Sequence, residues 1–226
     1  MESQSLLASR PLLIAIKSSL ERSKTTQNAF HSEARRILAI LDTVPLKSVR
    51  LPKSAHAITG QIGHLPSEDE GREHPPLGDV TRHLPYLPWT RTEGDSSASS
   101  HLTQRAANAN IIGPGALFPR EDIFLGLTLI APNTLCPSHH HPDAELCHPL
   151  MGGATWIIGG VARKLAPRDV IVSPPQAVHA IHTDHQPVLA LFVRLLSPAE
   201  TPPPDETPPR GAPRKHEPGH GVTARP

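Results

Sequence analysis

A short stretch that begins at His139 concentrates residue types that bind metals. His139 and His141 are separated by one residue, and Glu145 and Cys147 follow after a turn at Pro142. In an extended segment successive side chains point to opposite faces, so the two histidines share a face and Glu145 with Cys147 can rejoin them after the turn. The spacing therefore predicts two imidazoles and a carboxylate that converge on one point of a β-structure.

His179, at the end of a second apolar block, is a fourth candidate ligand. Neutral imidazoles with one carboxylate suit a divalent first-row metal, and this set does not choose between iron, zinc, manganese, cobalt and nickel. We expect His139, His141, Glu145 and His179 to bind one such ion of unknown identity. The alternatives are a solvated histidine-rich turn or histidines buried in a core, and the spacing favours the metal site.

This pattern resembles the two motifs of the cupin superfamily, whose members are small antiparallel barrels with a metal at the centre. The resemblance implies a mainly β chain that forms a single cupin β-barrel of the jelly-roll type, also called a double-stranded β-helix. The matching residues are His139, His141, Glu145 and, after six further residues, Gly152 in the first motif, and Asp169 to Pro174 with His179 in the second.

Length and charge limit the class of protein. The 226 residues suffice for one barrel-type core with appendages, so two domains are not expected. The net charge is +1, and no basic run is interleaved with aromatic residues, which argues against nucleic acid and anionic membranes as partners. We expect a small-molecule substrate, and homodimer formation is left open.

The segment 1–44 is predicted to be helical. Apolar residues recur at helical spacing over roughly 11–22 and 26–42, which predicts two amphipathic helices. The apolar run from Leu12 to Ile16 is too short to span a bilayer and lacks a small-residue cleavage site after it. We therefore expect a cytoplasmic protein.

The remaining chain divides by composition. Residues 45–106 are rich in proline, glycine, serine and charge, which predicts an irregular arm. The barrel is expected over 107–197, and the proline-rich segment 198–226 is expected to be a disordered tail because it offers no apolar anchor. Strand-like runs are Ile111-Ile112, Phe124–Ile130, the histidine segment, Ala154–Ile158, Asp169–Val172 and Val188–Val193.

Residues 111–194 contain a set of short motifs that one group of cupins shares. They are Ile112–Pro114, Gly126–Ile130, Pro137–Pro142, Ala144–Leu146, Pro149–Gly152, Ala154–Trp156, Pro174–Ala180 and Pro187–Leu191. In these motifs the segment resembles the dimethylsulfoniopropionate (DMSP) lyases of the cupin type. This resemblance implies a metal-assisted β-elimination that splits the substrate into dimethyl sulfide and acrylate, with the substrate's carboxylate on the metal.

Two departures from the family lie at the expected active site. The resemblance implies a tyrosine base two residues after the glutamate and a second tyrosine before Pro-x-His, but these positions are Cys147 and Cys136, the chain's only cysteines. We predict both to be catalytic-site residues. A thiol has a pKa of about 8.5 against about 10 for a phenol, so a thiolate base or ligand is chemically feasible. Its sulfur nevertheless falls roughly 3–4 Å short of a phenolic oxygen.

The alternatives to this lyase remain open at the level of sequence. They are a lyase that uses a water on the metal as its base, another metal-dependent cupin enzyme such as a dioxygenase or isomerase, and a noncatalytic cupin that binds a small ligand. In addition, Asn133, Arg168 and Gln176 stand where cupin motifs usually have turn glycines. The two cysteines lack C-x-x-C spacing and form no disulfide framework of the kind found in secreted domains, which favours a reducing compartment.

Overall fold

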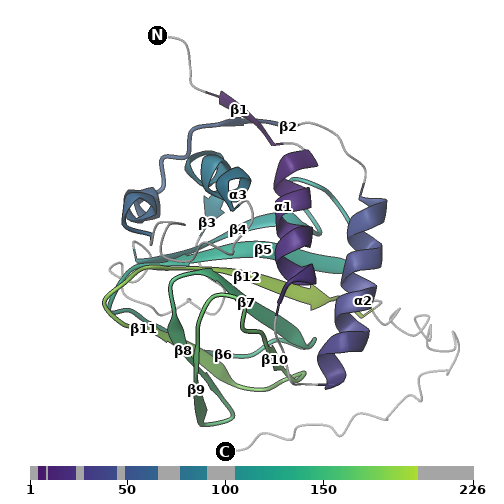
Figure 1. The fold of residues 1–226 in the computed structure, drawn as a ribbon, viewed down its shortest axis with the longest axis vertical. Coiled ribbons are helices and arrows are strands. Elements are labelled where there is room, and N and C mark those ends of the chain that lie inside the picture. The colour runs from purple at the N-terminus through teal and green to yellow at the C-terminus, as the bar shows by residue number, and fades with distance from the viewer. Residues whose placement is uncertain are drawn as a thin grey trace, which may run out of the picture.

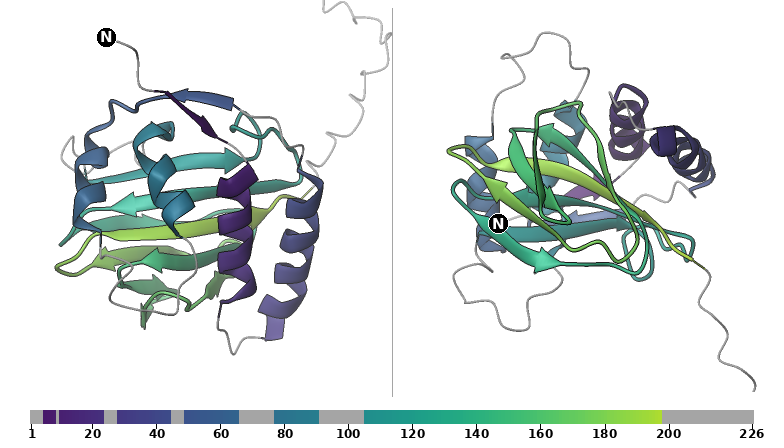
Figure 2. Two further views of the ribbon diagram at one scale, coloured as in Figure 1. Left: turned by 45° about the horizontal axis from the view of Figure 1, so that its top comes forward. Right: turned by 90° about the horizontal axis from the view of Figure 1, so that it is seen from below.

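The computed structural model describes residues 5–8, 10–23, 28–44, 49–65, 77–90 and 105–197. Two antiparallel sheets face each other, and helices cover the outer face of the larger one (Figures 1 and 2). The mainly β architecture predicted from the sequence is confirmed. The predicted tail at 198–226 lies outside the described residues.

Two long helices precede the sheets, close to where the apolar periodicity predicts them. They are α1 (Arg10–Glu21) and α2 (Asn28–Thr43). Their apolar stripes pack on the outer face of the larger sheet, where Leu12 and Ile16 are fully buried. None of the described helices has both the length and the apolar character needed to cross a membrane.

The predicted irregular arm contains more regular structure than its composition suggests. Single large apolar residues explain the difference, because Ile58, Val80 and Leu84 are fully buried and anchor short helices to the core. Trp89 is also buried and donates its indole N–H to the carbonyl of Leu84 at 2.8 Å. The elements of the arm are β2 (Val49–Pro52), η1 (Ala57–His64), α3 (Gly78–His83), η3 (Leu84–Tyr86) and β3 (Trp89–Thr90). Strand β2 pairs antiparallel with β1 (Ser5–Ala8), which precedes helix α1.

The larger sheet has the strand order β10-β7-β12-β5-β4-β3, and the smaller has β6-β11-β8-β9. The two sheets share no strand, so the barrel is not closed. The strands are β4 (Ala106–Ile112), β5 (Ile123–Ile130), β6 (Leu135–His139), β7 (Glu145–Met151), β8 (Ala154–Ile158), β9 (Val161–Leu165), β10 (Ile171–Ser173), β11 (His179–Thr183) and β12 (Val188–Leu195).

Strict alternation along the central strand β12 separates two apolar layers. Leu189, Leu191 and Val193 belong to the core shared with the helices, whereas Ala190 and Phe192 pack between the two sheets. Because both faces of β7 and β12 are covered, nearly every residue of these strands is buried. The inner layer holds the candidate site.

The turns that lack the expected glycines keep the backbone conformation that glycine would favour. Asn133, Arg168 and Gln176 have positive φ values of 49°, 80° and 60°. The turns are therefore retained without glycine, at a conformational cost of about 1–2 kcal/mol for a residue with a Cβ atom. Gly152 of the first motif has no such freedom, since a Cβ there would lie 2.3 Å from the carbonyl oxygen of Pro187.

Candidate metal centre and active site

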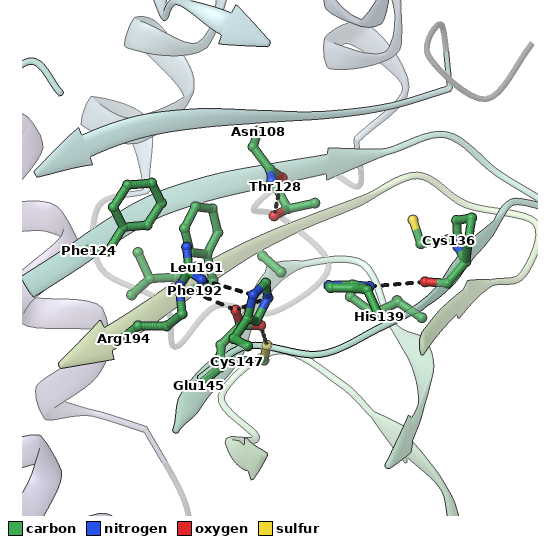
Figure 3. Close-up of a pocket in the computed structure, with 14 residues that line it drawn as sticks. Asn108, Phe124, Thr128, Cys136, His139, Glu145, Cys147, Leu191, Phe192 and Arg194 are labelled. Atoms are coloured by element: carbon green, nitrogen blue, oxygen red, sulfur yellow. Dashed lines mark hydrogen bonds and ion pairs between the residues drawn. The ribbon is translucent and has the colours of Figure 1, made fainter. Parts of the chain in front are cut away.

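A cavity opens between the two sheets at the end where β6 finishes and β7 and β11 begin. Figure 3 shows the side chains that line it. His139 closes β6, Glu145 opens β7 and His179 opens β11, so the ends of three strands deliver candidate ligands to one place. The lining residues are Asn108, Phe124, Thr128, Cys136, Pro137, His139, His141, Glu145, Cys147, Ile181, Ala190, Leu191, Phe192 and Arg194.

The three histidines predicted as ligands converge. His139 and His179 are direct cross-strand partners on β6 and β11, and their ring centroids are 4.4 Å apart. One ring nitrogen from each of His139, His141 and His179 can be chosen so that all lie within 4.8 Å of one another. His140, between the first two, is exposed. The alternation predicted from the sequence thus separates His140 from its neighbours.

Backbone carbonyls orient two of the three imidazoles. The Nδ1 atom of His139 donates to the carbonyl of Pro137 at 3.0 Å, and that of His179 donates to the carbonyl of Ala177 at 2.9 Å. With the proton on Nδ1, the Nε2 atom of each neutral ring presents its lone pair. This is the orientation that histidine ligands of metals adopt when a carbonyl holds the other ring nitrogen.

Glu145 lies at the centre of the cluster. One carboxylate oxygen, Oε2, is 3.0 Å from Nε2 of His141, while Oε1 is 3.6 Å from Nε2 of His179 and accepts a hydrogen bond from the Cys147 thiol at 3.2 Å. Burial raises the pKa of this carboxyl, but the hydrogen bond from His141, with help from Cys147 and His179, outweighs burial. The net pKa is below the ordinary value, and Glu145 is ionised.

The side chains fit a divalent cation. Among the described residues, Nε2 of His179 is buried without a hydrogen-bond partner. In the neutral ring this nitrogen faces the Glu145 carboxylate with its lone pair, and two facing lone pairs are satisfied by a cation between them. Imidazole nitrogen with carboxylate oxygen is a donor set that first-row divalent metals accept.

Both cysteines line this cavity, and both are free thiols. Burial raises the pKa of Cys136 to about 12. Burial, followed by the charge and hydrogen bond of Glu145, raises the pKa of Cys147 well above its ordinary value. At neutral pH both residues are therefore neutral thiols, and Cys147 is a hydrogen-bond donor to the carboxylate.

Several cavity residues were not singled out from the sequence. Arg194 contacts His141 and Glu145, and its guanidinium lies over the ring of Phe124, 4.7 Å from the centroid. On another wall, Thr128 donates to the side-chain oxygen of Asn108 at 2.8 Å. The sequence could have indicated that Arg194 faces the cavity. It lies two residues after Phe192 and four after Ala190 on β12, so its side chain is on the same, inner face of the sheet.

No tyrosine is found among the described residues that line the cavity. Tyr86, the only tyrosine of the chain, lies in η3 within the arm. The two cysteines therefore leave this cavity without a phenolic group.

Comparison with known proteins identifies the family. A profile described as dimethylsulfoniopropionate lyase matches residues 69–190, more than half of the chain. The chain belongs to the DMSP lyase family. This confirms the resemblance drawn from the motifs and supports a lyase-like function.

Individual members of the DMSP lyase family are distant in sequence. Dimethylsulfoniopropionate lyase DddQ of Ruegeria pomeroyi is 27% identical over 106 residues, which span 46% of this chain and about half, 53%, of that protein. A chain from the crystal structures of the DMSP lyases RdDddP and RnDddQII superimposes with a TM-score of 0.64 at 18% identity, over 82% of this chain and 91% of that one. The crystal structure of DddQ from R. pomeroyi gives 0.59 at 21% identity, over 83% and 94%. The two structures share the cupin-type fold of this chain.

Proposed function

We propose that this protein is a metal-dependent carbon–sulfur lyase that cleaves DMSP by β-elimination to dimethyl sulfide and acrylate. The observation that carries the proposal is the convergence of His139, His141 and His179 around the ionised Glu145, in a cavity of a DMSP lyase family member. These four residues would hold the ion. When bound, the metal supplies a Lewis acid that withdraws charge from the substrate's carboxylate and acidifies the neighbouring carbon.

The substrate needs a positive environment for its carboxylate and a wall for its sulfonium group. Arg194 places a permanent cation among the residues that line the cavity, beside the candidate ligands. Arg194 covers the ring of Phe124. The ring of Phe192, stacked 5.9 Å from that of Phe124, therefore serves as the aromatic surface for the sulfonium end.

The proton of the acidified carbon requires an acceptor, and Cys147 with Glu145 forms a relay for it. The proton passes to Sγ of Cys147 while the thiol's own proton passes to Oε1 of Glu145, 3.2 Å away. No free thiolate is needed, which fits a thiol whose pKa lies well above the ordinary value. The electron pair left on carbon forms the new C=C bond, and the C–S bond breaks with its pair on sulfur. Neutral dimethyl sulfide and acrylate result.

A second candidate function follows from the absence of tyrosine among the described cavity residues. The cavity could serve a different metal-dependent reaction, such as a dioxygenation or isomerisation, or bind a small ligand without turnover. A dioxygenase would consume oxygen when loaded with ferrous iron. A binding protein would bind DMSP or acrylate but release no dimethyl sulfide.

The deciding experiment measures both products. Purified protein loaded with Zn²⁺, Co²⁺, Mn²⁺, Ni²⁺ or Fe²⁺ is given DMSP, dimethyl sulfide is measured in the headspace, and acrylate is measured in solution. We expect equal amounts of both products with at least one metal and none after chelation. His140→Ala serves as the matched control for His141→Ala, because His140 is in the same motif but exposed. Oxygen consumption, or binding without either product, would contradict the proposal.

A further inference from the structure

Arg194 occupies a fixed position at the centre of the site. It lies on β12, directly across from Glu145 on β7 and from Phe124 on β5, so three neighbouring strands place these side chains in a row. Arg194 is 8% exposed, and its Nε atom is 3.9 Å from Oε2 of Glu145. Strand pairing and the stack on Phe124 thus hold a cation against the carboxylate.

The contact between Arg194 and His141 determines where the imidazole carries its proton. Nη1 of Arg194 is 2.9 Å from Nδ1 of His141. A guanidinium has donors and no acceptor, so Nδ1 of His141 must accept. The proton of the neutral ring is then on Nε2, which donates to Oε2 of Glu145 at 3.0 Å.

His141 is therefore in the opposite tautomer from its two partners. The carbonyls of Pro137 and Ala177 keep the Nδ1 protons on His139 and His179, which leaves their Nε2 lone pairs available for a metal. In His141 the Nε2 atom that faces Glu145 carries a proton. His139 and His179 therefore have the tautomer that can bind a metal through Nε2, whereas the hydrogen bond from Arg194 keeps His141 in the tautomer that cannot.

We propose that the positive charge of Arg194 is a permanent part of the candidate metal centre and that Arg194 sets the affinity of this centre for metal. In the metal-free protein the guanidinium neutralises Glu145 and keeps His141 in the tautomer that cannot ligate through Nε2. Metal binding through this nitrogen requires the Arg194–His141 hydrogen bond to break and the proton to move to Nδ1. The inference rests on the proposed metal site and adds a positioning role for Arg194.

Three substitutions separate the charge of Arg194 from its volume. Arg194→Met removes the cation but keeps a long side chain. Arg194→Gln also provides a carbonyl oxygen that can accept from Nδ1 of His141. Arg194→Lys keeps the charge and is the matched control. We expect Co²⁺ to bind at least tenfold more tightly to the Met and Gln variants than to the wild type, and within about threefold of the wild type for Lys.

The tautomer itself is measured without metal, by long-range ¹H–¹⁵N correlation spectra of the histidine rings, assigned with a His141→Gln variant. The wild type should show the proton on Nε2 of His141 and on Nδ1 of His139 and His179. In Arg194→Gln the His141 proton should move to Nδ1. A His141 ring with its proton on Nδ1 in the metal-free wild type would overturn the inference, and this result needs no variant of Arg194 to fold.

Measured Co²⁺ affinities distinguish an error in the role of Arg194 from an error in the proposed metal site. Dissociation constants for Co²⁺ come from competition with a chromogenic chelator, on variants whose circular dichroism matches the wild type. If the wild type binds Co²⁺ and the Arg194→Met and Arg194→Gln variants bind it with the same or lower affinity, the proposed role of Arg194 is wrong. The proposed metal site is unaffected by that result. Failure of the wild type and all three variants to bind Co²⁺ contradicts the metal site, and the inference falls with it.

Discussion

At the scale of single residues, the account depends on the contact between Cys147 and Glu145. If Cys147 relays the proton, Cys147→Ala should lower kcat by at least about a hundredfold, because general acid–base groups contribute roughly 10²–10⁴. Cys147→Tyr, which introduces the phenol that the family resemblance implies at this position, with its longer reach, should raise the rate of dimethyl sulfide release above wild type. Metal content should be unchanged in both variants.

The outcomes for these variants separate the alternatives. Activity of Cys147→Ala within about threefold of wild type would show that another group accepts the proton. Complete loss in Cys147→Tyr, with wild-type activity on a different substrate, would show that the cavity has been refitted. Cys136 was also predicted as a catalytic-site residue but takes no part in this relay, so Cys136→Ala is the control and should retain most activity.

Cys136 allows a test of pH dependence. Burial raises its pKa to about 12 in the folded protein, so the unfolded chain, with a thiol of ordinary pKa, releases this proton first as pH rises. The contribution of Cys136 to stability is therefore full below about pH 8.5 and declines toward pH 12. Urea unfolding at pH 8 and pH 10 should show a smaller decline for Cys136→Ala than for wild type.

Alkylation checks the same state directly. Folded protein should react with iodoacetamide at Cys136 far more slowly than urea-unfolded protein at pH 8, as read by mass spectrometry. Equal rates would show that the thiol is exposed and has an ordinary pKa.

The sequence could predict the ligands but not the charge that accompanies them. His139, His141, Glu145 and His179 follow from strand alternation and motif spacing, and the structure gathers their side chains. Arg194 is 49 residues from Glu145 along the chain, and only the pairing of strand β12 with strand β7 brings the two side chains together. Register between distant strands cannot be derived from one sequence.

At the scale of elements, the turns without glycine provide a stability test. Gln176 has φ of 60°, and its N–H donates to the carbonyl of His141 at 2.8 Å. Gln176→Gly should stabilise the protein by about 1 kcal/mol because the positive φ no longer conflicts with a Cβ atom. Gln176→Ala keeps the Cβ atom and should give no such gain. The measurement is the urea concentration at the midpoint of unfolding for both variants. Equal midpoints for Gln176→Gly and Gln176→Ala would show that the backbone at residue 176 is not strained.

Helix α1 offers a matched pair of isoleucines. Ile16 is fully buried and Ile14 is 51% exposed. Ile16→Ala should cost about 2–5 kcal/mol through lost burial and a cavity, whereas Ile14→Ala should stay within about 0.5 kcal/mol of wild type. Chemical denaturation measures both. Similar costs at the two positions would mean that α1 does not pack on the sheet through this face.

Helix periodicity and apolar strands were predictable, whereas polar strands were not. Helices α1 and α2 lie within two residues of their predicted bounds. Strand β9 was missed because four of its five residues are exposed, so its sequence Val-Ala-Arg-Lys-Leu has no buried face to reveal it. The short helices of the arm could not be predicted, because isolated apolar residues such as Ile58 and Val80 anchor them to the core and no periodic apolar stripe marks them in the sequence.

At the scale of the whole molecule, the layers explain how the charged residues of the site can be buried. The helices cover the outer face of the larger sheet, and the smaller sheet covers its inner face, as Figure 2 shows. The strands that carry Glu145 and Arg194 are therefore buried on both sides. Charges in such a place interact more strongly than on a surface, which is what the proposed metal centre and the proposed role of Arg194 require.

The central claim is that His139, His141, Glu145 and His179 bind one divalent metal ion. The most direct test is the metal content of the protein after exhaustive dialysis, measured by inductively coupled plasma mass spectrometry. We predict close to one divalent transition-metal ion per chain in the wild type and in His140→Ala, and almost none in the His141→Ala/His179→Ala double variant. A folded double variant that retains one ion per chain would contradict the account, because the metal would then be bound elsewhere.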